Sequence, residues 1–249
     1  MKPTIISIFT ASLFSLANTG FAEDTAWGYT GRTSADHWAA LSPDYRLCAS
    51  GKNQSPINID FKKALDFQNQ GIKFNYGHIT PLKIYNMDNV IRITVDKGTN
   101  IQVDGMTFEL KHLDIHMASE HTFNKQHHPM EIEFFHENAN KEIAIVSMMA
   151  VAGHADRTLR KILAQMPQKG ESKTLADNTL RSIEMKKKLA DYTRYNGSLT
   201  TPPCTEGVRW FILKQALTIS SEQQQQFQAV LGHANNRPIQ DTNARMVFK

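Results

Sequence analysis

The stretch LKHLDIHMASEH, residues 110–121, carries titratable side chains at every second position. His112, Asp114 and His116 alternate with apolar residues in it. Because successive side chains of a β-strand point to opposite faces, a strand here would place these three on one face, together with Leu110. Such a ladder is typical of a metal site, a proton relay or a polar sheet surface.

The run PMEIEFFH, a little further along, alternates in the same way and places Glu131 and Glu133 on one face of a strand. Two neighbouring antiparallel strands would bring Asp114, His116 and Glu133 over one cavity. Three protein ligands with a fourth position left for water is the arrangement of a catalytic metal site. By spacing alone, a hydrogen-bonded polar sheet face is the more common origin of such a pattern.

A third informative segment is YNGSLTTPPCTEGVRW, residues 195–210. Thr200 and Thr201 present adjacent hydroxyls, each able to donate one hydrogen bond and to accept others. If a buried carboxylate, Glu120 or Glu206, accepts the Thr200 proton, that hydroxyl must act as an acceptor towards a bound hydroxide. Without this context the segment is only a turn.

The elements that would position these residues are mainly strands. Alternating and β-branched runs predict strands at residues 90–95, 106–117, 131–136 and 142–151. Helical patterns occur around residues 157–165, 175–189 and 220–231, the last opening with a capping box. The fold class is therefore α+β, mainly β, with a central sheet, short peripheral helices and long loops.

The N-terminus has the pattern of a secretory signal peptide. Lys2 precedes an apolar run, Ile5–Ala17, and small residues favour cleavage after Ala22. No later apolar stretch is long enough to cross a bilayer. We expect export to the periplasm or the exterior, with residues 1–22 removed and residues 23–249 forming a single domain.

The net charge of +4 does not indicate a nucleic-acid partner. Lysines and arginines are scattered along the chain, and the densest cluster, residues 186–188, follows a helical pattern that suits a solvated face. Export argues in the same direction.

Two cysteines, Cys48 and Cys204, suit a single disulfide in an exported protein. The alternative is a pair of unbonded thiols in the core.

Several long motifs, in order along nearly the whole mature chain, resemble the α-class carbonic anhydrases of the bacterial, exported type. These motifs are WGYTG (Trp27–Gly31), DHWAAL, CASGKNQSPINID (Cys48–Asp60), the opening stretch with SEHTFNKQHHPME, YNGSLTTPPCTEGVRW and NNRPIQ (Asn235–Gln240). The resemblance implies a large twisted, mostly antiparallel sheet, a Cys48–Cys204 disulfide and reversible hydration of CO₂ to bicarbonate.

In this family three histidines hold a zinc ion, and here those positions fall on Asp114, His116 and Glu133. Aspartate and glutamate are both competent zinc ligands, so the resemblance still implies a metal site. Carboxylate ligands shift the preference towards harder ions, Mn²⁺ or Fe²⁺. A site without any metal is the remaining alternative.

The resemblance also assigns the surrounding positions. The catalytic positions are Thr200, Glu120 and Glu206; the substrate pocket is Phe135, Ile145, Leu199, Thr201 and Trp210; the positions that orient the ligands are His112, Glu131 and His121. Phe135 stands where the family has valine and should narrow the pocket. Asn89 occupies the position of the family's proton-relay histidine and cannot titrate, so the relay is missing unless His112 or a buffer replaces it; His112 is alternatively a substitute ligand.

These replacements predict an attenuated enzyme. Neutral histidines leave Zn²⁺ its full charge, which lowers the pKa of bound water to about 7. Two anionic ligands formally cancel that charge and raise this pKa, so activity should increase towards alkaline pH. The alternative is a catalytically silent binding protein that keeps the cleft. A homodimer is left open.

Overall fold

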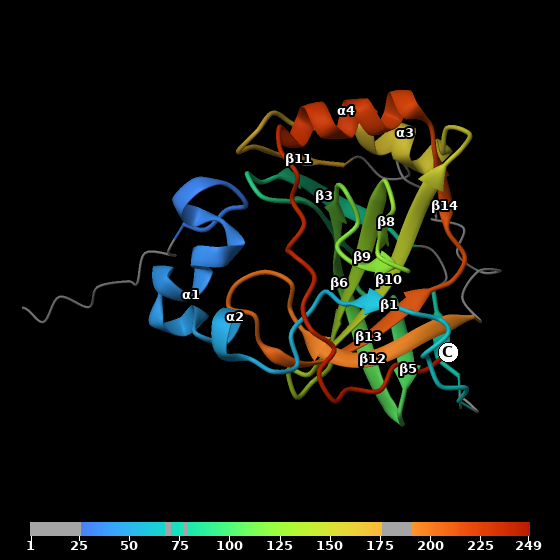
Figure 1. Ribbon diagram of the computed structural model, residues 1–249. Coiled ribbons are helices and arrows are strands. Elements are labelled where there is room, and N and C mark those ends of the chain that lie inside the picture. Colours follow the sequence, from blue (N-terminus) through green and yellow to red (C-terminus); the bar gives the residue numbers. More distant parts are fainter. Residues whose placement is uncertain (1–25, 68–70, 77–78, 176–190) are drawn as a thin grey trace, which may run out of the picture.

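The computed structural model describes residues 26–67, 71–76, 79–175 and 191–249. One large twisted sheet occupies the centre of the molecule (Figure 1). Within the described residues it has 11 strands: β2 (Lys73–Asn75), β3 (Pro81–Asn86), β4 (Ile91–Val95), β5 (Asn100–Val103), β6 (Met106–His116), β9 (Met130–Glu137), β10 (Ile143–Ala152), β11 (Ser172–Thr174), β12 (Tyr192–Ser198), β13 (Glu206–Leu213) and β14 (Leu217–Ile219).

The main strand order is β11-β3-β4-β6-β9-β10-β13-β12, with β5 beside β6, β2 beside β5 and β14 beside β10. Neighbours are antiparallel except where β10 meets β13 and β14. A small second sheet joins β1 (Asn58–Ile59), β7 (Thr122–Phe123) and β8 (Gln126–His127). The expected fold class, a mainly antiparallel sheet with short helices, is confirmed, and all four predicted strands are present.

Helices lie at the periphery of the sheet (Figure 1). They are α1 (Trp38–Leu41), α2 (Leu47–Ser50), α3 (Arg157–Ala164) and α4 (Ser221–Leu231), with 3₁₀ turns at Gly31–Thr33, Ala35–His37 and Pro43–Tyr45. The capping box predicted at Ser220 is present, with Gln223 as its partner. The helix expected around residues 175–189 and the signal peptide, residues 1–22, lie outside the described residues, among which no helix has the length and apolarity of a membrane span.

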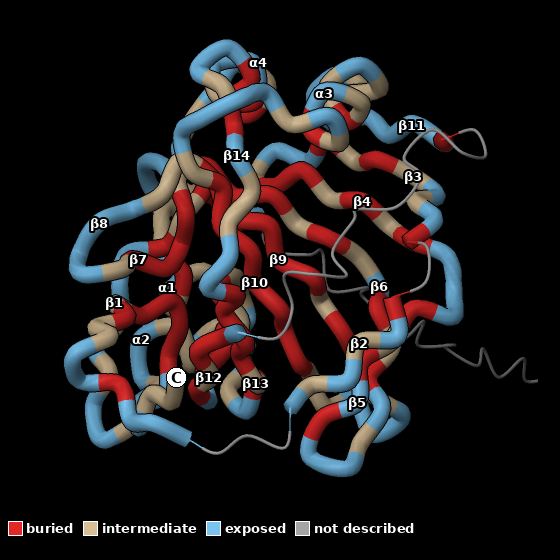
Figure 2. Tube along the Cα trace, turned by 90° about the vertical axis from the view of Figure 1, so that its right-hand side faces the viewer, coloured by how far each residue is buried: buried red, intermediate tan, exposed pale blue. Residues whose placement is uncertain are grey.

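The central strands are buried along most of their length (Figure 2). One face of β6 and β9 contributes to the main core, through Leu113 and Ile132 among others. Leu110 packs in that same core, so its predicted place beside His112, Asp114 and His116 is wrong. The physical reason is a β-bulge: the register of β6 against β9 shifts between Leu110 and His112, which changes the alternation at that point.

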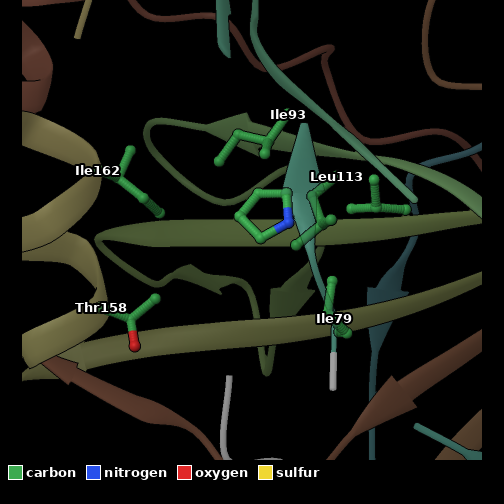
Figure 3. Close-up of a pocket in the computed structure, with 7 residues that line it drawn as sticks. Ile79, Ile93, Leu113, Thr158 and Ile162 are labelled. Atoms are coloured by element: carbon green, nitrogen blue, oxygen red, sulfur yellow. The ribbon is translucent and has the colours of Figure 1, made fainter. Parts of the chain in front are cut away.

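Helix α3 covers this core face of the sheet. Thr158 and Ile162 of α3 point towards Ile93 of β4 and Leu113 of β6 (Figure 3). Only a small apolar cavity of about 10 Å³ remains between them. The charged side chains of β6 and β9 therefore lie on the opposite face of the sheet.

A disulfide joins Cys48 of α2 to Cys204 in the loop before β13, with an S–S distance of 2.06 Å. The disulfide is confirmed, and the alternative of two free thiols is wrong. Gln54 donates a hydrogen bond from its side-chain amide to the Cys204 carbonyl, which further connects these two segments. Together they anchor the chain that follows Thr200 and Thr201.

Reduction of this disulfide should destabilise the fold substantially. The bond spans 156 positions, and for a loop of this size the chain-entropy relation gives up to about 5 kcal/mol. Chemical denaturation with and without dithiothreitol measures the loss. A Cys48→Ala/Cys204→Ala variant should have the lower stability already and should not respond to the reductant; an equal response of both proteins would contradict this explanation.

His136 is a completely buried neutral histidine in the main core. Its Nδ1–H donates to the Ala144 carbonyl at 3.2 Å, so Nε2 accepts from the Tyr76 hydroxyl at 2.5 Å. Burial lowers the pKa of His136 to about 3. Folding therefore favours the uncharged imidazole. Between pH 3 and pH 6.5 the folded protein binds fewer protons than the unfolded chain.

This imidazole should contribute to acid instability. A histidine whose pKa is lower in the folded protein contributes its full share of the free energy of unfolding above the pKa of the unfolded state, about 6.5. This contribution is lost as the pH falls below that value, and the loss is about 2 kcal/mol between pH 7 and pH 5. Urea denaturation at these two pH values should show a smaller loss for His136→Gln than for the wild type. The exposed His154→Gln serves as the control and should behave as the wild type. Identical losses for His136→Gln and the wild type would contradict the assignment.

Candidate metal centre

A cavity of about 230 Å³ lies on the face of the sheet opposite α3. Strands β4, β6, β9 and β10 and the loop after β12 supply its walls: Arg92, His112, Asp114, His116, Glu133, Phe135, Ile145, Leu199, Thr200, Thr201 and Pro202. The antiparallel register pairs Asp114 with Glu133 and His116 with Glu131. The prediction that Asp114, His116 and Glu133 share one cavity on neighbouring strands is therefore met.

Asp114 forms an ion pair with Arg92, a residue that the sequence did not indicate as part of the site. Arg92, opposite it on β4, donates from Nε to Oδ1 at 2.7 Å and from Nη2 to Oδ2 at 2.6 Å. His112 Nε2 lies 3.5 Å from Oδ2. Burial raises the pKa of Asp114, but His112 and the Arg92 guanidinium outweigh it and hold that pKa well below its usual value. Both carboxylate oxygens are thus already engaged by a bidentate partner.

His116 is oriented for a ligand by the chain near the C-terminus. Its Nδ1–H donates to the Asn235 carbonyl at 2.7 Å, which leaves Nε2 with its lone pair. Nε2 lies 3.8 Å from Glu133 Oε2, and Nδ1 lies 3.6 Å from Glu120 Oε1. This tautomer, with a carbonyl as partner for the other ring nitrogen, is the arrangement of metal-bound histidines.

His116, Glu120 and Glu133 form one buried cluster, whose ligand atoms all lie within 4.8 Å of one another. One oxygen of each carboxylate, Glu120 Oε2 and Glu133 Oε1, is buried without a hydrogen-bond partner among the described residues. Asp114 does not belong to this cluster. Unpaired buried carboxylate oxygens are costly, and a cation is the partner that suits them.

The electrostatics of the cluster favour positive charge. Burial, and after it the charges of Glu120 and Glu131, raise the pKa of Glu133 well above its usual value. Burial lowers the pKa of His116, but the Glu120 carboxylate and the hydrogen bond to Asn235 outweigh it, so that pKa is raised. Both shifts show a negative potential that attracts a proton or a metal ion. The residues present therefore fit a divalent cation.

His121 and Glu131 lie behind Glu133 rather than in the cavity wall. Glu131 Oε1 is 2.8 Å from His121 Nδ1, and Glu131 accepts further hydrogen bonds from the His121 amide and the Ser147 hydroxyl. Burial raises the pKa of Glu131, but His121 and these hydrogen bonds lower it to about 2. His121 Nε2 continues the network to the Tyr195 hydroxyl at 2.6 Å. This buried network stiffens β9 below the cluster.

Thr200 and Thr201 line the cavity, and Thr200 is almost completely buried. The contacts of Thr200 and Glu120 do not include a hydrogen bond between them; Glu120 Oε1 instead accepts from the Arg237 amide at 3.2 Å. Phe135 lines the cavity and stacks on His112, with ring centroids 4.5 Å apart; the narrowing expected from this residue stays a prediction.

Three other expected site residues lie outside the cavity wall. Glu206 accepts from the Asn53 amide at 2.6 Å and from the Gln54 side chain at 3.1 Å, so it anchors the disulfide region. Asn89 donates from its side chain to the Trp27 carbonyl at 2.6 Å. Trp210 is fully buried and packs edge-on against the His121 ring, with centroids 4.7 Å apart.

Fold and cavity together define a twisted-sheet protein with a candidate metal centre formed by a histidine and carboxylates. Comparison with known proteins is specific. The profile of the eukaryotic-type carbonic anhydrase family matches residues 33–249. A carbonic anhydrase of Pectobacterium carotovorum is 36% identical over 242 residues, covering 96% of this chain and 97% of that protein. One of Neisseria gonorrhoeae is 36% identical over 247 residues, covering 99% and 96%.

Among solved structures, the α-carbonic anhydrase of Thermovibrio ammonificans, in complex with the inhibitor sulfanilamide, superposes with a TM-score of 0.82. It is 36% identical, and the match covers 91% of this chain and 100% of that one. The chain belongs to the α, or eukaryotic-type, carbonic anhydrase family, whose members are in general zinc enzymes that hydrate CO₂. Family and relatives support carbonic anhydrase activity for it.

Replacement of Arg92 should lower the stability of the protein, because Arg92 is the ion-pair partner of Asp114. Breaking a buried ion pair leaves an uncompensated charge; since 34% of the Arg92 side chain is exposed, we expect a reduced cost of about 1–2 kcal/mol for Arg92→Gln. Thermal and urea denaturation measure it. Lys141→Gln, which removes an exposed pair with Glu137, is the matched control and should have no measurable effect. A wild-type stability for Arg92→Gln would contradict the assigned role.

Proposed function

We propose that this chain catalyses the reversible hydration of CO₂ in the cavity between β6, β9 and the Thr200 loop, with attenuated, metal-dependent activity. The observation that carries the proposal is the buried cluster of His116, Glu120 and Glu133, of which His116 and Glu133 line this cavity, with carboxylate oxygens that suit a cation. Family membership supports the reaction, and the geometry supports a modified centre.

The chain's own residues supply binding and orientation. A bound divalent ion supplies a Lewis acid that lowers the pKa of a water molecule. His116 is held in the required tautomer by the Asn235 carbonyl, and Glu133 faces it. Ile145 and Leu199 provide an apolar wall suited to CO₂. The Thr200 hydroxyl lines the cavity and makes no side-chain hydrogen bond within the described part of the chain, so it is available to a reacting oxygen.

Three features support attenuation. Carboxylates in place of neutral histidines reduce the effective charge of the ion. The Arg92 guanidinium beside Asp114 adds a positive charge near the cation position, which weakens binding of the ion. Asn89, engaged with the Trp27 carbonyl, cannot carry a proton out of the cavity. Zn²⁺ is the family's metal, and the oxygen donors equally suit Mn²⁺ or Fe²⁺.

A catalytically silent binding protein is the second candidate, and one observation favours it. The bidentate pair of Arg92 and Asp114 neutralises a carboxylate at a ligand position without a metal. In that case the cavity would accept a small ligand and not turn it over.

Export is part of the proposal. The Cys48–Cys204 disulfide supports an oxidising compartment, the periplasm or the exterior. We also propose to test for a homodimer by sedimentation of the mature chain.

Stopped-flow CO₂ hydration tests the proposed activity. The metal-loaded wild type should exceed the uncatalysed rate, with a rate that rises towards alkaline pH because anionic ligands raise the pKa of bound water. The Asp114→His/Glu133→His variant should gain about tenfold or more, since it restores neutral histidines at all three ligand positions of the family. Thr200→Val is the control for positioning and should reduce the rate of both proteins. If wild type and variant match the buffer rate despite stoichiometric metal, the silent candidate is supported instead.

A further inference from the structure

We propose that the divalent cation is held by His116, Glu133 and Glu120, and that Arg92 keeps Asp114 out of its coordination. The inference rests on the proposed function for the presence of a cation and then assigns which side chains bind it. It gives Glu120 the role of a ligand and Asp114 the role of a structural partner for an arginine.

Asp114 has no free oxygen to offer. Arg92 approaches Oδ1 at 2.7 Å and Oδ2 at 2.6 Å, and His112 Nε2 lies 3.5 Å from Oδ2. The antiparallel pairing of β4 with β6 sets Arg92 directly opposite Asp114, so the pair is built into the sheet. A cation bound to Asp114 would lie close to the guanidinium and be repelled by it.

Unlike Asp114, Glu120 has a carboxylate oxygen that is available to a cation. It is fully buried, and its Oε2 accepts no hydrogen bond from any residue that the structure describes. Its Oε1 is held by the Arg237 amide, which orients the carboxylate without neutralising it. The Arg237 guanidinium donates to the Gln54 side chain and to the Ser55 and Cys48 carbonyls, and its charge acts on Glu120 only from beyond ion-pair distance.

Charge balance leads to the same assignment. Among the described residues, the ion-pair contacts of Glu120 and of Glu133 are each with His116 alone. Two buried carboxyl groups therefore share one imidazole, and either a proton between them or a cation must balance their charge. A divalent cation between them satisfies both, and one nitrogen with two carboxylate oxygens is a suitable donor set for Zn²⁺, Mn²⁺ or Fe²⁺.

Metal binding by the full mature chain tests this assignment. The chelator-stripped protein is titrated with Zn²⁺ and with Co²⁺, by calorimetry and by the visible absorption of bound Co²⁺. Glu120→Gln and Glu133→Gln should each weaken binding about tenfold or more, and Glu120→Gln should change the Co²⁺ spectrum. The control is Arg92→Gln/Asp114→Asn, which removes the ion pair without a change in net charge. It should bind within about threefold of the wild type and keep the spectrum.

The opposite pattern would overturn the proposal: a large loss for Arg92→Gln/Asp114→Asn with none for Glu120→Gln makes Asp114 the ligand. No stoichiometric binding by the wild type would overturn it too. Circular dichroism checks that each variant folds. If Glu120→Gln does not fold, Glu120→Asp keeps the charge, shortens the reach and should still weaken binding.

Hydration rates separate the two proposals. Activity with metal binding that is insensitive to Glu120→Gln refutes this ligand set and leaves the proposed function standing. Binding that depends on Glu120 without any CO₂ hydration supports the ligand set and refutes the function.

Discussion

The antiparallel register between β6 and β9 is the constraint on which the rest of the site depends. It pairs Asp114 with Glu133 and His116 with Glu131, while the alternate residues of both strands pack against α3 and the main core. A shift of one residue would exchange these faces and bury the charges in the apolar core. The hydrophobic stabilisation of one face of the sheet therefore holds the polar face in place.

Given that register, the site is governed by the balance of buried charge. The cavity and its floor bring together Asp114, Glu120, Glu131 and Glu133, each of which needs a partner. Arg92 neutralises Asp114 and His121 pairs with Glu131, so Glu120 and Glu133 remain around His116. Arg92 thus balances the charge of Asp114, and a cation bound by the cluster of His116, Glu120 and Glu133 would balance the charge of the two glutamates.

The surrounding scaffold is rigid where the site needs it. Asn235 binds the His116 ring through its carbonyl and the Met117 amide through its side chain, so it sets the end of β6. The disulfide fixes the segment after the threonines to α2. Preorganisation of this kind keeps ligands and cavity wall in place even where individual ligand residues have changed. It explains how a retained fold coexists with an altered centre.

Much of the fold and part of the site could be predicted from the sequence. Strand periodicity identified β4, β6, β9 and β10, and the shared cavity of His116 and Glu133 followed from alternation; the family motifs supplied the Cys48–Cys204 bond. Three features could be found only in the three-dimensional structure. A β-bulge interrupts the alternation after Leu110, Arg92 binds Asp114, and Glu120 lies in one cluster with Glu133. Local periodicity states which face a side chain occupies. It does not state which side chain of a distant strand reaches across to it, because that depends on long-range register and on the balance of buried charge.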